Sequence, residues 1–160
     1  MDISVQLGEG IFNFRVGVIL MNQERVLLHR GENDDFWALP GGRVTMFEST
    51  VETAVREIKE EIGVDVTVNR LLWHTENFFT FDEKAFHEIA NYYKVDILNP
   101  ESINLGHEPF KGIEQGSDLI YQWFPITSLS TINLYPVFLR NELARLPEHP
   151  RFLTITQENL

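Results

Sequence analysis

The segment GRVTMFESTVETAVREIKEEIGV, residues 42–64, decides how the rest of this chain is interpreted. It begins as a glycine loop and continues as a predicted helix. Ser49 followed three residues later by Glu52 is a capping-box signature, so the helix is expected to begin near Ser49 or Thr50. Gly63 is the expected C-terminal stop of this helix. The segment therefore predicts one loop that leads into one helix.

The predicted helix has two chemically different faces. Apolar residues at helical spacing predict a buried stripe made of Val51, Ala54, Val55, Ile58 and Ile62. Glu57, Glu60 and Glu61 are expected to share the opposite face, because residues three and four apart are neighbours on a helix. Negative charges near the C-terminal end of a helix interact unfavourably with the helix dipole, at a cost of about 0.3–1 kcal/mol each. A hard divalent cation would offset this cost, and a solvated acidic face with Arg56 and Lys59 as partners is the alternative.

The spacing of this segment resembles the signature of the Nudix hydrolase family. The matching positions are Gly42, Glu48, Arg56, Glu57, Ile58, Glu60, Glu61, Gly63 and Val64. The resemblance implies an α/β fold, a Nudix-type α/β/α sandwich with a mixed sheet. It also implies a metal-dependent hydrolase that cleaves the pyrophosphate bond of a nucleoside diphosphate linked to another group. Nucleoside triphosphates, ADP-ribose-like compounds and nucleotide sugars stay open as substrates, and a nucleotide-binding sensor that does not hydrolyse is the alternative.

The same resemblance implies roles for individual residues. The implied metal ligands, directly or through water, are Glu57, Glu60 and Glu61. The implied metal is Mg²⁺, for which Mn²⁺ substitutes. Either Glu60 or Glu114 is expected to accept the proton of the attacking water. Arg56 cannot act as a base, and it is expected to pair with Glu48 and brace the loop against the helix.

Length, charge and composition limit the other possibilities. The 160 residues, 43% of them hydrophobic, predict a single domain over residues 1–160. The sequence contains neither a long apolar stretch nor a signal peptide, which predicts a cytoplasmic protein without a membrane anchor. The absence of cysteine excludes disulfides and thiolate metal sites. A net charge of −11 argues against long nucleic acids as partners but not against a small nucleotide, and a homodimer stays open.

Two strands are predicted before the motif. Residues 11–20 alternate between apolar and other side chains, and residues 26–30 follow after a turn. Arg15 and Arg30 lie on these strands or at their ends, and each is either a surface charge or a phosphate contact. His29 is expected to pack or lie at the surface, since no second histidine stands at metal-ligand spacing from it.

The lead-in to the motif is WALPGG, residues 37–42, which is similar to the approach to the motif in many Nudix proteins. Pro40 ends a short apolar run, and Gly41 and Gly42 allow the backbone to turn tightly beside a ligand or the helix. Arg43 is either a phosphate contact or an exposed side chain. The predicted substrate-binding residues are Arg30, Gly41, Gly42 and Arg43.

The segments after the motif predict strands and a second helix. Residues 64–68 predict a strand, and residues 71–81 with 86–97 predict a hairpin whose aromatic residues mostly belong to the core. One or two of these aromatic residues are free to stack on a base. Residues 136–146 predict an amphipathic helix, and residues 152–156 predict an edge strand or a partner contact.

Residues 99–117 form a long polar connection, which predicts a lid or specificity loop. The connection contains Glu114 shortly before the predicted strand at residues 119–124. Glu114 is the candidate for the extra metal ligand or base that many Nudix enzymes carry in the corresponding loop. Glu108 and Glu88 are the alternatives for this role.

Overall fold

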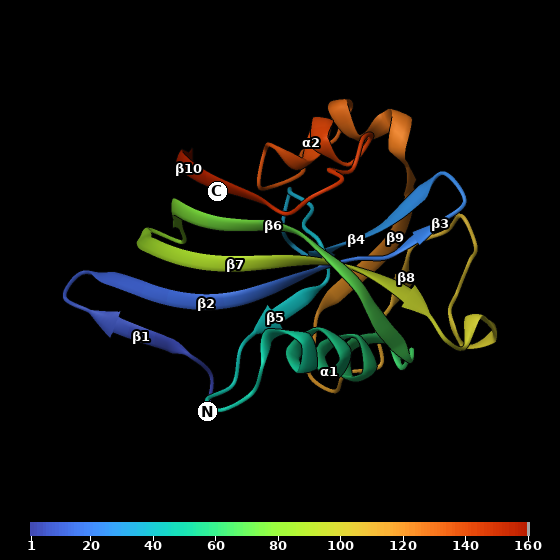
Figure 1. Ribbon diagram of the computed structural model, residues 1–160, viewed down its shortest axis with the longest axis horizontal. Helices are drawn as coiled ribbons and strands as arrows, with labels where there is room; N and C mark the ends of the chain where they lie inside the picture. The colour runs from blue at the N-terminus through green and yellow to red at the C-terminus, as the bar shows by residue number, and fades with distance from the viewer. Residues whose placement is uncertain (160) are drawn as a thin grey trace.

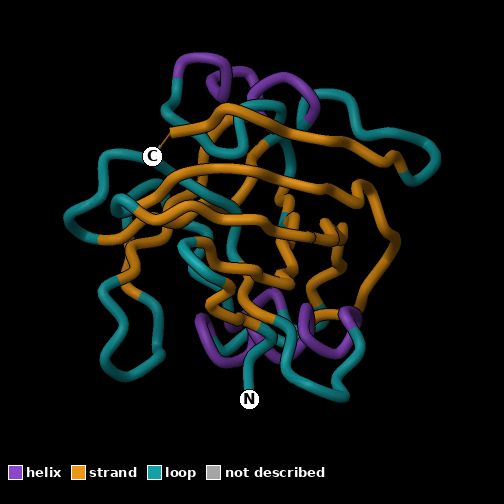
Figure 2. The backbone as a smooth tube through the Cα atoms, turned by 90° about the vertical axis from the view of Figure 1, so that its left-hand side faces the viewer, coloured by secondary structure: helices purple, strands orange, loops and turns teal. Residues whose placement is uncertain are grey.

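The computed structural model describes residues 1–159, and it describes side chains as far as residue 156. A layer of strands lies between helix α1 (Thr50–Ile62) on one side and the segments η2 (Ile126–Thr131) and α2 (Leu139–Glu142) on the other (Figure 1). Figure 2 shows the same three layers after a turn of 90°, with helices above and below the strands. This arrangement is the predicted α/β sandwich.

The larger sheet is mixed, as predicted. Its strands are β1 (Ser4–Leu7), β2 (Gly10–Ile19), β5 (Gly41–Arg43), β6 (Val66–Phe81), β7 (Lys84–Ile97) and β10 (Arg151–Asn159). The order is β1-β2-β7-β6-β10, and β5 pairs with residues 15–17 of β2. Strand β2 runs parallel to β7, and β10 runs parallel to β6, whereas β6 and β7 form the predicted antiparallel hairpin. The predicted edge strand at the end of the chain is therefore confirmed.

A second, antiparallel sheet was not predicted as a separate unit. It consists of β3 (Met21–Asn22), β4 (Arg25–Gly31), β9 (Leu119–Pro125) and β8 (Phe110–Lys111), in the order β3-β4-β9-β8. The sequence predicted its two longer strands, but their pairing joins segments about ninety residues apart, which local patterns do not reveal. The connection 99–117 contains β8 and the short helix η1 (Pro100–Ser102).

Two buried apolar clusters hold the layers together, one on each side of β2. Val16, Val18 and Leu20 pack with the α1 side, while Ile19 packs with Leu139 on the other side. Alternation along a strand therefore directs the odd-numbered positions of β2 away from α1. The polar members of that odd-numbered set line the site described below.

Helix α1 has the predicted ends and most of the predicted buried stripe, but two residues lie on the opposite face from the one expected. The Ser49 hydroxyl accepts a hydrogen bond from the Glu52 N–H at 3.2 Å, and Gly63 adopts a left-handed conformation with φ of 72°. Val51, expected in the buried stripe, is 43% exposed, whereas Glu61, expected on the outer face, is 3% exposed. The buried face follows the spacing of Ala54, Ile58, Glu61 and Ile62, which includes one acidic residue. The assignment of Glu61 to the outer face was wrong because helical position, not polarity, decides which side chain turns inward.

The helix predicted over residues 136–146 is shorter than expected. Only Leu139–Glu142 is α-helical, because the chain before it forms turns with hydrogen bonds between residues three apart, such as Leu139 N–H to the Pro136 carbonyl. Leu139 and Leu143 are fully buried, as the apolar spacing predicted. Buried leucines at helical spacing therefore identified the packing face but not the helix length.

Candidate active site

The loop and helix of the motif are joined by a pair of charged side chains. The Nε and Nη2 atoms of Arg56 donate to Glu48 Oε1 at 2.7 Å and to Glu48 Oε2 at 2.9 Å. Glu48 Oε2 also accepts from the Thr45 N–H and the Thr53 hydroxyl, at 3.2 and 3.0 Å. These bonds, the one from Arg56 above all, lower the pKa of Glu48 to about 2. The predicted pairing of Glu48 with Arg56 is present, and we call these two residues the brace.

Arg56 also holds two of the carboxylates proposed as metal ligands. Its Nη1 donates to Glu57 Oε1 at 2.8 Å and to Glu60 Oε2 at 3.1 Å. The Glu57 side chain is 15% exposed, and burial raises its pKa, whereas the Glu60 side chain is 50% exposed. A Cβ atom on Gly42 would lie 2.3 Å from Glu57 Cδ, so the glycine provides the space in which this carboxylate lies.

Glu61 has a different environment from the other carboxylates of the motif. Its side chain is buried beneath the end of α1 beside Tyr121, and its Oε2 has no hydrogen-bond partner within residues 1–159. Burial, strengthened by the charges of Glu57 and Glu114, raises the pKa of Glu61 to about 8. A buried acceptor without a donor costs about 1–3 kcal/mol, so this oxygen is poised for a ligand that the fold itself does not supply.

Glu114 is brought to this region by its loop. The Ile113 N–H donates to the backbone carbonyl of Glu61 at 2.8 Å, which ties the loop to the end of α1. A Cβ atom on Gly112 would lie 2.5 Å from the same carbonyl oxygen, so this close approach requires glycine. The proximity of Glu114 is consistent with its effect on the pKa of Glu61, which is raised first by burial and further by this second carboxylate.

Arg15 is the positive group between the carboxylates and a neighbouring pocket. Burial raises the pKa of both Glu61 and Glu88, and the charge of Arg15 opposes both rises. Arg15 on β2 lies directly opposite Arg43 on β5, a pairing of like charges that destabilises a sheet. No residue in the described part of the chain forms a hydrogen bond or ion pair with either guanidinium group. Two unpaired guanidinium groups side by side are suited to an anion such as phosphate.

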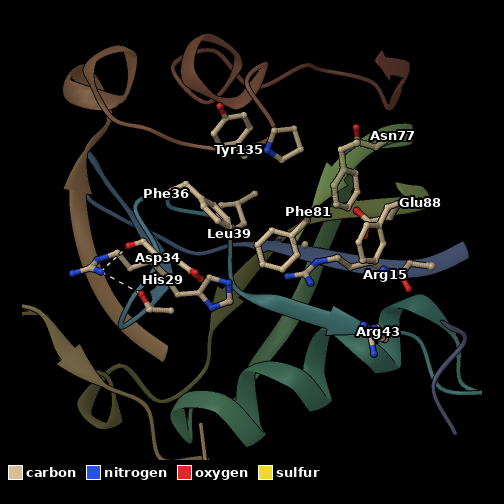
Figure 3. A pocket seen from close by; sticks show the side chains of 18 of the residues that line it. Arg15, His29, Asp34, Phe36, Leu39, Arg43, Asn77, Phe81, Glu88 and Tyr135 are labelled. Atoms are coloured by element: carbon tan, nitrogen blue, oxygen red, sulfur yellow. Dashed lines mark hydrogen bonds between the residues drawn. The ribbon is translucent and has the colours of Figure 1, made fainter. Parts of the chain in front are cut away.

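The pocket beside Arg15 has a volume of about 300 Å³ (Figure 3). Its polar lining includes Asn13, Arg15, His29, Arg43, Asn77 and Glu88. His29 is buried and packs on Tyr121 with ring centroids 5.5 Å apart, which confirms the predicted packing role. Burial and, to a smaller degree, Arg15 lower the pKa of His29 to about 3, so the imidazole is neutral at pH 7.

The sequence offered both Arg15 and Arg30 as possible phosphate contacts and placed only Arg30 among the predicted substrate-binding residues, and the structure separates the two. Arg30 Nη1 donates to the carbonyls of Gly31, Glu32 and Asp34 at 3.0–3.2 Å, and its guanidinium group covers the Trp37 ring at 5.3 Å. Arg30 lines the pocket but is engaged by its own loop, so its role as a substrate contact stays a prediction. Asn13 and Asn77 were missed, although the alternation of β2 placed Asn13 on the same face as Arg15.

The carboxylates suit a hard cation by their chemistry rather than by a preformed cage. Within residues 1–159, no group of three acidic or histidine side chains converges in the geometry of a metal site. Glu61 nevertheless offers a buried oxygen without a donor, and Glu57 is desolvated nearby. Oxygen donors of this kind match the preference of Mg²⁺ and Mn²⁺. Arg56 at present occupies oxygens of Glu57 and Glu60.

Comparison with known proteins identifies the family. Residues 12–144 match the NUDIX domain model, so the chain belongs to the Nudix family. The m7GpppN-mRNA hydrolase of Saccharomyces cerevisiae is 37% identical over 60 residues, which are 38% of this chain and 6% of that protein. The putative ADP-ribose pyrophosphatase YjhB of Bacillus subtilis is 42% identical over 53 residues, or 33% of this chain and 26% of that protein. The chain thus spans a small part of the length of these relatives.

Solved structures share the fold at low sequence identity. The MutT protein of Bacillus halodurans superposes with a TM-score of 0.62 at 16% identity, covering 89% of this chain and 88% of that one. The ORF135 protein of E. coli gives a TM-score of 0.57 at 21% identity, covering 88% and 94%. At these identities the likeness supports the fold alone. Within the described residues, no helix is long and apolar enough to cross a membrane.

Proposed function

We propose that this protein hydrolyses a phosphoanhydride bond in a derivative of a nucleoside diphosphate, with a divalent cation as cofactor. The observation that carries the proposal is the buried Glu61 oxygen without a donor, beside the desolvated Glu57 and next to a pocket that contains two unpaired arginines. Acidic ligands for a cation and basic contacts for phosphates thus lie side by side. This combination is suited to attack on a phosphate whose own charge repels the nucleophile.

The residues of the chain divide the work between them. Glu57, Glu60 and Glu61 would hold Mg²⁺, or Mn²⁺ in its place. The cation would neutralise phosphate charge and lower the pKa of a bound water. Arg15 and Arg43 would attract and orient the phosphates. The net negative charge of the protein does not prevent this, because the two guanidinium groups act on the phosphates at contact distance. The brace keeps the loop and the helix in a fixed relation.

Two carboxylates are candidates for the base that accepts the proton of the attacking water. Glu60 is half exposed and hydrogen-bonded to Arg56, and Glu114 is exposed in the loop tied to the end of α1. Glu88, an alternative at the sequence level, lies in the pocket floor among Asn13, Arg15 and Asn77, and Glu108 is an exposed loop residue. We therefore assign the base to Glu60 or Glu114.

The test is product release from a panel of nucleoside triphosphates, ADP-ribose and nucleotide sugars, with Mg²⁺ and with chelator. Wild type is compared with Glu61→Gln. Metal-dependent cleavage that the variant loses supports the hydrolase. A wild type that binds nucleotides but cleaves none of the panel would overturn the proposal in favour of a Nudix-like nucleotide sensor.

Three further properties belong to the same proposal. The substrate is a small nucleotide rather than a long nucleic acid, which agrees with the net charge of −11. A cytoplasmic location agrees with the absence of cysteine. Homodimer formation stays a prediction that size-exclusion chromatography with light scattering will decide.

A further inference from the structure

The floor of the pocket contains a row of polar side chains across three neighbouring strands. Asn13 on β2 is in register with Glu88 on β7, and Glu88 is in register with Asn77 on β6. Each of the three is 4–6% exposed. Burying three polar groups in the middle of a sheet is unfavourable unless each finds partners, so the row needs an explanation.

The hydrogen bonds within this row leave acceptors open toward the pocket. The Ser4 hydroxyl donates to Asn13 Oδ1 at 2.6 Å, so the Asn13 amide nitrogen is left to donate, and it bonds Glu88. Asn77 Oδ1 is buried and has no partner within the described residues. Within the described residues Glu88 forms no ion pair, although Arg15 and Arg43 are close enough to counteract the rise that burial causes in its pKa. The row thus presents a carboxyl group and an amide oxygen that call for donors.

The walls of the pocket are aromatic. Phe79 and Phe86 flank the row and stack on each other with ring centroids 4.9 Å apart. Phe36 contacts both Phe81 and Tyr135 edge-on, with ring centroids 5.9 Å apart in each pair. Figure 3 shows Phe36, Phe81 and Tyr135 around the same hollow as Asn77 and Glu88. A cavity of about 300 Å³ with such walls suits a flat heteroaromatic ring.

We propose that Glu88, supported by Asn77, recognises the donor edge of a guanine base. Guanine presents a ring N–H beside an exocyclic amino group, and these two parallel donors match the two oxygens of a carboxylate. Adenine and cytosine place a single amino donor beside a ring acceptor, and uracil places one N–H between two carbonyls, so each would set an acceptor against an acceptor. This inference rests on the proposed function for its phosphate end, and it names the class of substrate as a guanine nucleotide.

The test is binding of nucleoside monophosphates without metal, measured by calorimetry on the wild-type protein. GMP is expected to bind about tenfold more tightly than IMP, which lacks the amino group, and about 100-fold more tightly than AMP. Equal binding of GMP and AMP, or no saturable binding of GMP, overturns the inference. The comparison of ligands needs no variant, so it does not depend on the folding of a mutant.

A matched pair of variants locates the selectivity. Glu88→Gln replaces one acceptor by a donor at nearly constant shape, so the preference for GMP over AMP is expected to fall at least tenfold. Glu83→Gln removes the same charge from the exposed β6–β7 turn and should leave the preference unchanged. If Glu88→Gln does not fold, Asn77→Ser serves instead and should weaken GMP several-fold. Equal preference in wild type and the row variant contradicts the assignment.

The two proposals fail in distinguishable ways. Metal-dependent hydrolysis with no guanine preference would retain the proposed function and remove the role of Glu88. The opposite result is guanine-selective binding that the Glu88→Gln variant loses, with no hydrolysis of any guanine nucleotide. This result would support recognition of guanine by Glu88 and contradict the proposed hydrolase activity.

Discussion

Glu48 and Glu61 belong to the same motif, yet the fold surrounds their carboxylates in opposite ways. Both oxygens of Glu48 accept hydrogen bonds from Arg56, and these bonds lower its pKa to about 2. Glu61 is 3% exposed with an oxygen that lacks a donor, and burial raises its pKa to about 8. The folded chain supplies hydrogen-bond donors to both oxygens of Glu48 but leaves one oxygen of Glu61 without a donor.

This difference distinguishes residues that fix the geometry of the site from residues that contact the ligand. A carboxylate with every oxygen bonded contributes to the fold and has little left to offer a ligand. A buried carboxylate with one oxygen that lacks a donor destabilises the fold, and such local costs are typical of functional positions. Glu48 is therefore expected to act on activity through geometry, and Glu61 through direct contact with a cation.

The largest effects are expected for Glu61→Gln. Hydrolysis should fall by about 100-fold or more, because a direct ligand should matter at least as much as the outer-shell partners of a metal. Without metal at pH 8, the free energy of unfolding should rise by about 2–4 kcal/mol, since the variant no longer buries an ionisable group. This gain should disappear as the pH falls to about 3.5, where Glu61 is mostly protonated in both folded and unfolded chains. Steady-state rates and urea unfolding at both pH values measure the two effects.

The control for this stability gain is Glu60→Gln, because the Glu60 side chain is 50% exposed. It should change the free energy of unfolding by less than about 1 kcal/mol. A destabilised Glu61→Gln protein at pH 8 would show that Glu61 has donors that complete it in the folded chain.

Two adjacent glycines allow a matched comparison between a loss of fold stability and a loss of activity. A Cβ on Gly41 would lie 2.0 Å from the Val16 carbonyl oxygen, at a φ of 144°, so Gly41→Ala should destabilise the fold by about 2–4 kcal/mol. A Cβ on Gly42 would instead meet the end of the Glu57 side chain, which is able to move. Gly42→Ala should thus lower activity by about tenfold or more and stability by less than about 1 kcal/mol. Thermal unfolding and rates per folded molecule separate the outcomes, and equal destabilisation by both changes would contradict the account.

The brace is expected to give a smaller loss of activity. Glu48→Gln should lower the free energy of unfolding by about 1–3 kcal/mol, because Arg56 loses a charged partner. Turnover should fall by about tenfold while metal binding is retained, since Glu48 contacts no proposed ligand. Full activity in this variant would remove the brace from the mechanism.

The helix of the motif was predictable because its signals are local. The capping box of Ser49 and Glu52 and the stop at Gly63 depend on neighbouring residues and are present as expected. The partner of Arg56 came from the family resemblance. The inward position of Glu61 was recoverable from helical spacing, but its acidity suggested the opposite face.

The pocket was not predictable, because its residues meet only through strand register. Asn13, Glu88 and Asn77 come from three strands, and their row depends on the alignment of β2 with β7 and of β7 with β6. Alternation places each side chain on one face of the sheet, but it does not say which residues of neighbouring strands lie side by side. The same limit explains why the distinction between Arg15 and Arg30 emerged only in the structure.

The smallest effect concerns the neutral imidazole at the pocket edge. Burial lowers the pKa of His29 to about 3, so the unfolded chain binds a proton that the folded chain does not between pH 6.5 and 3. Stability contributed by this group is present above pH 6.5 and is lost as the pH falls. Relative to wild type, His29→Asn should gain about 2 kcal/mol in the free energy of unfolding between pH 6.5 and 5. Urea unfolding at the two pH values measures this, and a constant difference would mean that the imidazole is protonated in the folded protein.

The measurement that tests the central claim most directly is the stabilisation by Mg²⁺ at pH 8, where Glu61 is at its pKa. Unfolding is followed with and without the metal for wild type, Glu61→Gln and Glu48→Gln. At 100 times the dissociation constant the metal should add about 2.7 kcal/mol to wild type. The account predicts a similar gain for Glu48→Gln and little or none for Glu61→Gln. An equal gain in wild type and Glu61→Gln, or no gain in wild type, would contradict it.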